Sequence, residues 1–106
     1  MSSAFVIDPP AVISLPVTGD SRRFAVNRIY CVGRNYADHA REMGHDPDRE
    51  PPFFFMKPAN SIVTDGKDMA YPNLSSDVHH EIEMVVAIGK GGANIAADNA
   101  LDHVYG

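Results

Sequence analysis

The chain of 106 residues carries a formal charge of −5 and 44% apolar residues, which is ordinary for one small globular domain with a modest core. The sequence has no cluster of lysines and arginines, so it does not predict a nucleic-acid partner. It has neither an apolar run as long as a membrane span nor the pattern of a secretory signal, so it does not predict a membrane partner. The single cysteine, Cys31, excludes an internal disulfide, suits a reducing cytoplasm and is expected to be a buried small apolar residue.

The first third of the chain predicts short antiparallel strands. Residues 12–17 have strand composition, and Pro16 confines that strand to an edge or an end. Residues 19–20, Gly-Asp, are a turn signal, and apolar and polar residues alternate over 24–26. Residues 29–32, Ile-Tyr-Cys-Val, have the composition of a buried strand.

A short helix and a loop are expected next. Asn35 is a suitable N-cap for a helix over residues 36–43, and Gly44 suits the position just after its end. Residues 45–52 are polar and contain proline, which predicts a loop.

The second half predicts strands and a final helix. Residues 53–56, Phe-Phe-Phe-Met, form a short strand closed by Lys-Pro, and residues 61–63 are expected to form another. Asp-Gly at 65–66 is a turn signal, and residues 80–88 predict a strand that enters the core. A helix is expected over 96–104, after which the apolar pattern continues to the last residues, so the fold reads as interrupted.

Two carboxylates at the start of the strand over 80–88 are the main chemical signal. Glu81 and Glu83 are two residues apart, so in a strand they project from one face. Their like charges repel each other at this separation, so their placement needs an explanation. One reason is a hard cation such as Mg²⁺ or Mn²⁺, which prefers oxygen ligands; the other is an exposed edge strand whose charges deter aggregation. The neighbouring His79 and His80 point to opposite faces and are expected to have structural or supporting roles.

A second set of chemical candidates lies upstream. His39 and Glu42 are three apart and share a helical face, as in a water-activating pair, although an ordinary surface pair has the same spacing. Lys57 is either a cation for an anionic substrate or a solvated strand-end lysine. Residues 89–92, Gly-Lys-Gly-Gly, lack the spacing of a phosphate loop and are interpreted as a hairpin-type or strand-to-helix connection.

Taken together, these segments resemble the fumarylacetoacetate hydrolase family. The matching words are Tyr-Cys-Val-Gly-Arg-Asn-Tyr-Ala-Asp-His at 30–39, Phe-Phe-Phe-Met-Lys-Pro-Ala at 53–59, and His-Glu-Ile-Glu at 80–83 followed by residues 85–90. They occur in the family's order and spacing, and the resemblance covers residues 24–106. The segment 41–55 looks most like the bacterial fumarylpyruvate hydrolase branch.

The resemblance implies an α+β fold: a mixed β-roll with short flanking helices, usually in a homodimer. Residues 1–23 are then an N-terminal leading segment, and residues 24–106 are the N-terminal half of a catalytic domain. The family's third acidic ligand lies further along the domain than this sequence reaches, so a fragment, a truncated product or a cleaved chain is expected.

The resemblance also implies roles for individual residues. Glu81 and Glu83 ligate Mg²⁺ or Mn²⁺, while His39 and Glu42 activate water. Arg34 and Lys57 lie near the substrate.

The expected reaction is hydrolysis of a C–C bond in a small oxo acid of the β-diketo type, converting fumarylpyruvate to fumarate and pyruvate. Two family alternatives remain open, namely decarboxylation of oxaloacetate and isomerisation of an unsaturated oxo-diacid. A non-catalytic fragment or assembly module is the alternative from another class, because the ligand set within these 106 residues is incomplete.

Overall fold

The computed structural model describes residues 4–33 and 51–106. The chain divides into two compact units, residues 1–70 and residues 71–106, and each is described by itself. The helix expected over 36–43 and most of the loop expected over 45–52 lie outside the described residues. Within the described ranges, no helix is long and apolar enough to cross a membrane.

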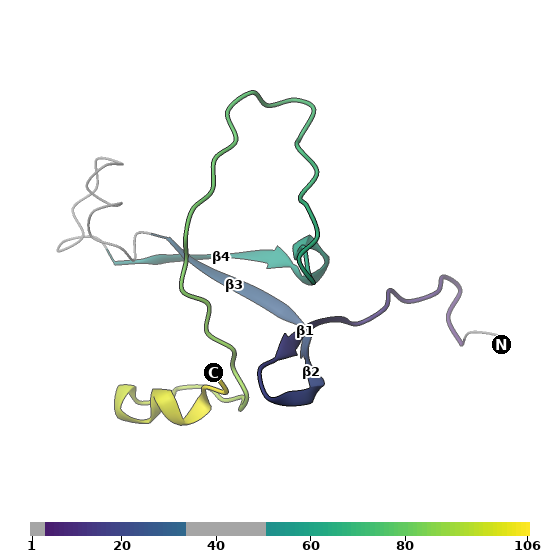
Figure 1. Ribbon diagram of the computed structural model, residues 1–106. Coiled ribbons are helices and arrows are strands. Elements are labelled where there is room, and N and C mark those ends of the chain that lie inside the picture. The colour runs from purple at the N-terminus through teal and green to yellow at the C-terminus, as the bar shows by residue number, and fades with distance from the viewer. Residues whose placement is uncertain (1–3, 34–50) are drawn as a thin grey trace. The chain divides into compact units, whose positions relative to one another are not determined.

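A β-hairpin begins the first unit (Figure 1). Strand β1 (Ile13–Val17) pairs antiparallel with β2 (Asp20–Val26), with a shift in register between Pro16 and Val17. Gly19 has a φ of 77° in the connecting turn, a left-handed conformation that glycine adopts without a steric cost. The predicted strand over 12–17 is confirmed over residues 13–17, and a turn is confirmed at Gly19, although Asp20 of the predicted turn is already the first residue of β2.

The second strand pair carries the aromatic residues. Strand β3 (Arg28–Gly33) pairs antiparallel with β4 (Phe53–Pro58) in one continuous register that places Gly33 opposite Phe53. Both strands include the residues predicted from composition and extend beyond them. The two strands pair although they are distant in sequence, because each presents apolar side chains on its pleated faces.

One face of this pair holds a stacked aromatic cluster. The rings of Phe53 and Phe55 lie 5.9 Å apart between centroids at an interplanar angle of 29°. The Phe53 ring covers Gly33 so closely that a Cβ added to this glycine would overlap it. Cys31 lies opposite Phe55 and is half-buried, so the prediction of a fully buried cysteine is only partly met.

The chain leaves β4 through a short 3₁₀-helix, η1 (Ala59–Ser61), and not through a further strand. The strand predicted over 61–63 is therefore wrong. The Ser61 hydroxyl donates to the Pro58 carbonyl at 2.7 Å, and the Ile62 amide donates to the Ala59 carbonyl at 3.2 Å. Local hydrogen bonds of this kind compete with the cross-strand ladder that a strand needs.

The turn predicted at residues 65–66 is confirmed. Asp65 and Gly66 have φ values of 59° and 73°, and the Lys67 amide donates to the Thr64 carbonyl at 3.2 Å. Positive φ at both central positions is typical of a type I′ turn, for which Asp-Gly is a preferred sequence.

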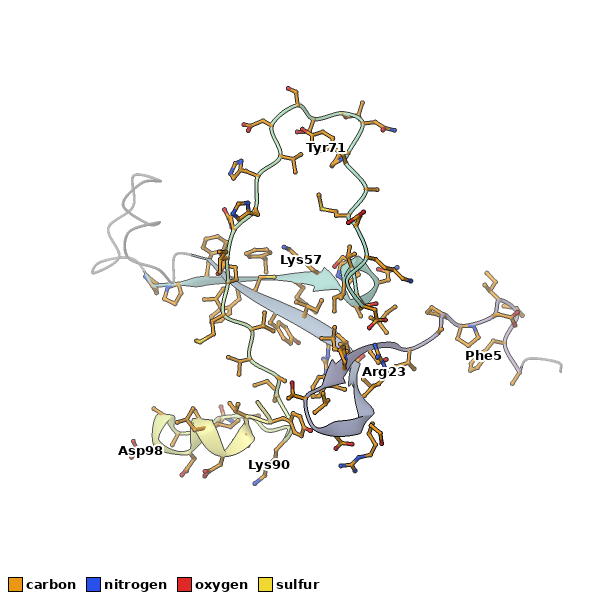
Figure 2. All side chains as sticks on the ribbon, viewed as in Figure 1. Phe5, Arg23, Lys57, Tyr71, Lys90 and Asp98 are labelled. Atoms are coloured by element: carbon orange, nitrogen blue, oxygen red, sulfur yellow. The ribbon has the colours of Figure 1, made fainter. Side chains whose placement is uncertain are left out.

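Arg23 on β2 connects this turn to the first hairpin (Figure 2). Its Nε donates to Ser14 Oγ at 2.8 Å, and its Nη2 donates to the Ser14 carbonyl at 2.9 Å and to Asp65 Oδ1 at 3.2 Å. The Arg23 guanidinium lowers the pKa of the Asp65 carboxyl, because the hydrogen bond favours the charged form. One side chain therefore links segments that are 42 residues apart.

The second unit has little regular structure. Its one described helix is η2 (Ala97–His103), which matches the position of the helix expected over 96–104 but is of the 3₁₀ type. Ile88 forms an isolated antiparallel bridge with Val104, immediately after this helix.

Large apolar side chains remain exposed in both units. In the described ranges no large side chain is fully buried, and two-stranded sheets of this kind are marginally stable alone. The described residues form two small antiparallel sheets and two short 3₁₀-helices. The exposed large apolar side chains on the second strand pair are Tyr30, Val32, Phe53, Phe54, Phe55 and Met56.

Replacing Arg23 by Gln is expected to raise the pKa of Asp65 toward its ordinary value, since the guanidinium hydrogen bond is lost. Because the pKa is lowered in the folded chain, the stabilisation from Asp65 is present above the unfolded pKa of about 3.9. It is lost as the pH falls through the folded pKa, and NMR titration of the Asp65 carboxyl carbon measures the change.

Arg22→Gln is the matched control. Arg22 Nη2 donates to Asp20 Oδ2 at 2.7 Å and lowers the pKa of Asp20, so this variant should move Asp20 and leave Asp65 unchanged. Identical Asp65 titration curves for Arg23→Gln and the parent chain would contradict the link.

Candidate metal and substrate site

The paired carboxylates lie in the unit of residues 71–106, on a segment without regular structure. The strand predicted over 80–88 is wrong, since among the described residues its first seven positions, 80–86, form no ladder, and Ile88 forms only an isolated bridge with Val104. A strand forms where a neighbouring strand completes its ladder, and no strand among the described residues pairs with residues 80–86. Glu81 and Glu83 are both exposed.

Antiparallel pairing begins at the end of this segment. The Ala87 amide donates to the Gly106 carbonyl and the Tyr105 amide donates to the Ala87 carbonyl, both at 2.8 Å. The Gly89 amide donates to the His103 carbonyl at 2.8 Å. We call this pairing of residues 87–90 with residues 103–106 the C-terminal clasp; it fixes one end of the segment that carries the carboxylates.

The glycine-rich connection belongs to the clasp. His103 Nδ1 lies 2.9 Å from the Lys90 carbonyl, and a Cβ added to Gly92 would lie 3.0 Å from His103 Cε1. Residues 89–92 thus lead from the carboxylate segment to η2, which is the connecting role that the sequence predicted. The pairing of residues 104–106 was missed, although β-branched Val104 followed by Tyr105 is a composition that favours an extended backbone.

The two histidines beside the carboxylates are exposed. His79 Nδ1 lies 3.6 Å from Asp77 Oδ1, and the Asp77 amide donates to Ser75 Oγ at 3.2 Å. His79 therefore has an acidic neighbour other than Glu81 or Glu83.

Lys57 lies on β4 in the first unit, opposite Ile29 (Figure 2). Its Nζ is 6.0 Å from the centroid of the Phe55 ring, at the outer limit of a cation–π contact, and the side chain is exposed. The lysine thus offers a positive charge next to an apolar surface. Arg34, His39 and Glu42 lie outside the described residues.

The donor atoms suit a hard divalent ion, although they do not complete its coordination. Carboxylate oxygens such as those of Glu81 and Glu83 are ligands for Mg²⁺ and Mn²⁺, and Mg²⁺ takes about six ligands including water. Within residues 4–33 and 51–106, no three His, Cys, Asp or Glu side chains are grouped so that they could hold a metal. The described part of the chain therefore offers two exposed carboxylates and no complete ligand set.

Both the aromatic strand pair and the carboxylate segment fall within one family match. Residues 28–106 match the family described as Fumarylacetoacetate (FAA) hydrolase C-terminal. The chain belongs to this family, and the resemblance predicted from its sequence is confirmed.

Individual relatives differ in their reactions. The chain is 50% identical to fumarylpyruvate hydrolase from Pseudomonas aeruginosa, solved in complex with Mn²⁺ and pyruvate, with a TM-score of 0.88 over 95% of this chain and 45% of that chain. It is 46% identical over 80 residues to the mitochondrial oxaloacetate decarboxylase of Dictyostelium discoideum, covering 74% of this chain and 36% of that protein. It is 37% identical over 79 residues to the mitochondrial oxaloacetate tautomerase of Arabidopsis thaliana, covering 74% and 35%.

Two conclusions follow from these matches. The chain spans less than half the length of these relatives. The relatives include a hydrolase, a decarboxylase and a tautomerase, so membership of the family defines a class of oxo-acid enzymes and not one reaction.

Gly89→Ala is expected to loosen the clasp. A Cβ at position 89 would lie 3.0 Å from Tyr105 Cβ and 3.5 Å from Tyr105 Cα, so the paired backbones must move apart. Overpacking of this size costs about 1 kcal/mol, which predicts roughly fivefold faster amide hydrogen exchange at Tyr105.

Gly91→Ala is the control for this prediction, because a Cβ at that position meets nothing within 4 Å. Equal exchange rates at Tyr105 in the two variants would show that close packing at Gly89 is unimportant.

Proposed function

We propose that the chain supplies part of the active site of a divalent-metal-dependent hydrolase that cleaves a C–C bond in a β-diketo acid, with fumarylpyruvate as substrate. The observation that carries this proposal is the similarity to the Pseudomonas aeruginosa enzyme, at 50% identity and a TM-score of 0.88 over 95% of the chain. That enzyme was solved with Mn²⁺ and pyruvate, and pyruvate is one product of the proposed reaction.

In this proposal Glu81 and Glu83 are two of the ligands of Mg²⁺ or Mn²⁺. Their exposure leaves both carboxylates accessible to an ion, and their spacing places them on one side of an extended backbone. The bound ion would supply Lewis-acid polarisation of the oxo-acid end of the substrate. The remaining ligands come from water and from elsewhere in the complete enzyme.

His39 and Glu42 are proposed to activate water. Glu42 orients the imidazole and raises its basicity, so that His39 removes a proton from water. The resulting hydroxide adds to the carbonyl carbon of the fumaryl group. The bond from that carbon to the adjacent methylene then breaks, and the released electron pair and one proton go to the pyruvate fragment.

Arg34 and Lys57 are proposed to bind the substrate's carboxylates. Both are cations in a chain with a net charge of −5, so a local positive charge is needed near an anionic substrate. The exposure of Lys57 supports this role, because its charge is accessible to an anionic substrate.

The surrounding architecture is also a proposal. Residues 1–23 would precede the domain, and residues 24–106 would form the N-terminal half of a mixed β-roll in a homodimeric, cytoplasmic enzyme. The small antiparallel sheets of the described residues are compatible with this arrangement.

Oxaloacetate chemistry is the second candidate function. It is favoured by the 46% identity to the oxaloacetate decarboxylase of Dictyostelium discoideum. Decarboxylation uses the same polarised oxo acid without a water nucleophile, so it would not need the His39–Glu42 pair as a base. A non-catalytic assembly module remains the candidate from another class, supported by the incomplete ligand set of the described residues.

Mn²⁺ titration of the 106-residue chain tests the ligand assignment. Paramagnetic broadening in NMR spectra should centre on the amides around Glu81 and Glu83. Glu83→Gln should weaken the apparent affinity by roughly tenfold, because one charged oxygen ligand is lost. Asp98→Asn, which changes a carboxyl on η2 in the same unit, should leave the titration unchanged. Unaltered broadening in Glu83→Gln would remove Glu83 from the metal site.

A substrate panel separates the two reactions. The full protein product of the gene is purified and incubated with Mn²⁺ and either fumarylpyruvate or oxaloacetate. Equimolar fumarate and pyruvate are expected from the first substrate, and His39→Ala should lower that rate by about 10²-fold or more, the size of a general-base contribution. Release of CO₂ from oxaloacetate while fumarylpyruvate is unchanged would reject the hydrolase in favour of the decarboxylase.

A further inference from the structure

Asp65 and Gly66, at the centre of the type I′ turn, have a reactivity that the proposed function does not use. Asp65 is the only aspartate in the sequence that is followed by glycine. Its side chain is 48% exposed, so water reaches the carboxyl group. A Cβ built on Gly66 meets nothing within 4 Å among the described residues, so the amide nitrogen of Gly66 is not crowded. The pair therefore presents a carboxyl group and an unhindered backbone amide on adjacent residues.

This combination favours aspartate isomerisation, because glycine has no Cβ to hinder its own nitrogen. The Gly66 nitrogen attacks the side-chain carboxyl carbon of Asp65, an N–C bond forms, and the carboxyl OH leaves with a proton as water. A second water molecule then opens the resulting succinimide ring at either carbonyl. Opening at the side-chain carbonyl restores aspartate, whereas opening at the main-chain carbonyl gives isoaspartate, whose main chain is one methylene longer. The sequence of steps needs no reagent other than water.

Two hydrogen bonds oppose this reaction in the folded chain. Arg23 Nη2 donates to Asp65 Oδ1 at 3.2 Å, and Thr64 Oγ1 donates to Asp65 Oδ2 at 3.3 Å. Arg23 is itself fixed by its two bonds to Ser14. Both carboxylate oxygens are therefore held, and the side chain is confined to one orientation instead of sampling the rotamers from which its carbon approaches the next amide.

The same contacts keep the carboxyl group in its less reactive, ionised form. Departure of the OH as water requires the neutral acid. The hydrogen bond from Arg23 lowers the pKa of Asp65, and this effect and the positive charges of Arg23 and Lys67 outweigh the opposing effect of burial. At any pH above this pKa, the neutral fraction of Asp65 is therefore smaller than that of a free aspartate.

We propose that Asp65 and Gly66 form a site of spontaneous aspartate isomerisation, and that Arg23 protects this site by holding the carboxylate. The longer main chain of isoaspartate would disrupt the turn bond from the Lys67 amide to the Thr64 carbonyl. The carboxylate would also move from the side chain to the main-chain position, away from Arg23. The turn and its link to the first hairpin would thus be lost together. The proposal rests on groups of the first unit and does not depend on the proposed reaction.

Incubation of the purified protein at physiological temperature, over a series of mildly acidic to neutral pH values, tests the proposal. Isoaspartate at residue 65 is quantified by peptide mapping with electron-transfer mass spectrometry. Arg23→Gln should raise the rate by about threefold or more, because the neutral fraction and the rotamer freedom of Asp65 both increase. Its pH profile should also move to higher pH, since the pKa of Asp65 rises. Arg22→Gln, which removes the guanidinium beside Asp20, should match the parent protein.

Three outcomes would overturn the protective role of Arg23. The first is an equal rate in Arg23→Gln and the parent, and the second is an equal increase in Arg22→Gln. The third is a faster rate in Arg23→Gln with an unshifted pH profile, because general loosening of the unit would raise the rate at every pH alike.

The urea-unfolded chain tests the site itself. Isoaspartate at residue 65 should form faster there than in the folded protein, because the bonds from Arg23 and Thr64 are absent. In urea, Gly66→Ala should slow the reaction severalfold, since the added methyl group hinders the attacking nitrogen. Failure of the unfolded parent chain to form isoaspartate at residue 65, or an unchanged rate in Gly66→Ala, would overturn the assignment of the site.

Discussion

A β-strand needs a neighbour, because its backbone amides and carbonyls find partners only across the ladder. This requirement explains which extended segments of the chain are strands. Strands β1 and β2 are joined by a tight turn at Gly19, and β3 and β4 find each other in one continuous register. Among the described residues, the segment that carries Glu81 and Glu83 has a ladder partner only at its end, where residues 87–90 meet residues 103–106.

The small number of paired strands also limits how far side chains are buried. A two-stranded sheet has two faces and little to cover them, so aromatic residues such as Phe54 remain exposed on β4. Hydrogen bonds between polar side chains therefore help to hold the segments of the first unit together. Arg23 holds both Ser14 and Asp65, and it does so through a planar guanidinium that can serve several acceptors at once.

The two carboxylates of the second unit are consistent with part of a larger metal site. Glu81 and Glu83 offer hard oxygen donors at the exposed end of a segment whose other end is fixed by the clasp. In the proposed site, a divalent ion would offset the repulsion between these two like charges. The chain belongs to a family whose members include a hydrolase, a decarboxylase and a tautomerase.

The sequence by itself determined the family, the first three strands, the strand that begins at Phe53, both Gly-containing turns and the position of the last helix. These features depend on local composition, on turn residues with positive φ, or on motif words in a fixed order. Only the tertiary structure decided the others. Residues 80–88 have strand composition, but within the described ranges most of them have no ladder partner. Residues 61–63 use local hydrogen bonds instead, and the clasp pairs residues that no local pattern connects. Strand pairing is a long-range property, so composition can favour a strand but cannot supply the neighbour that makes it one.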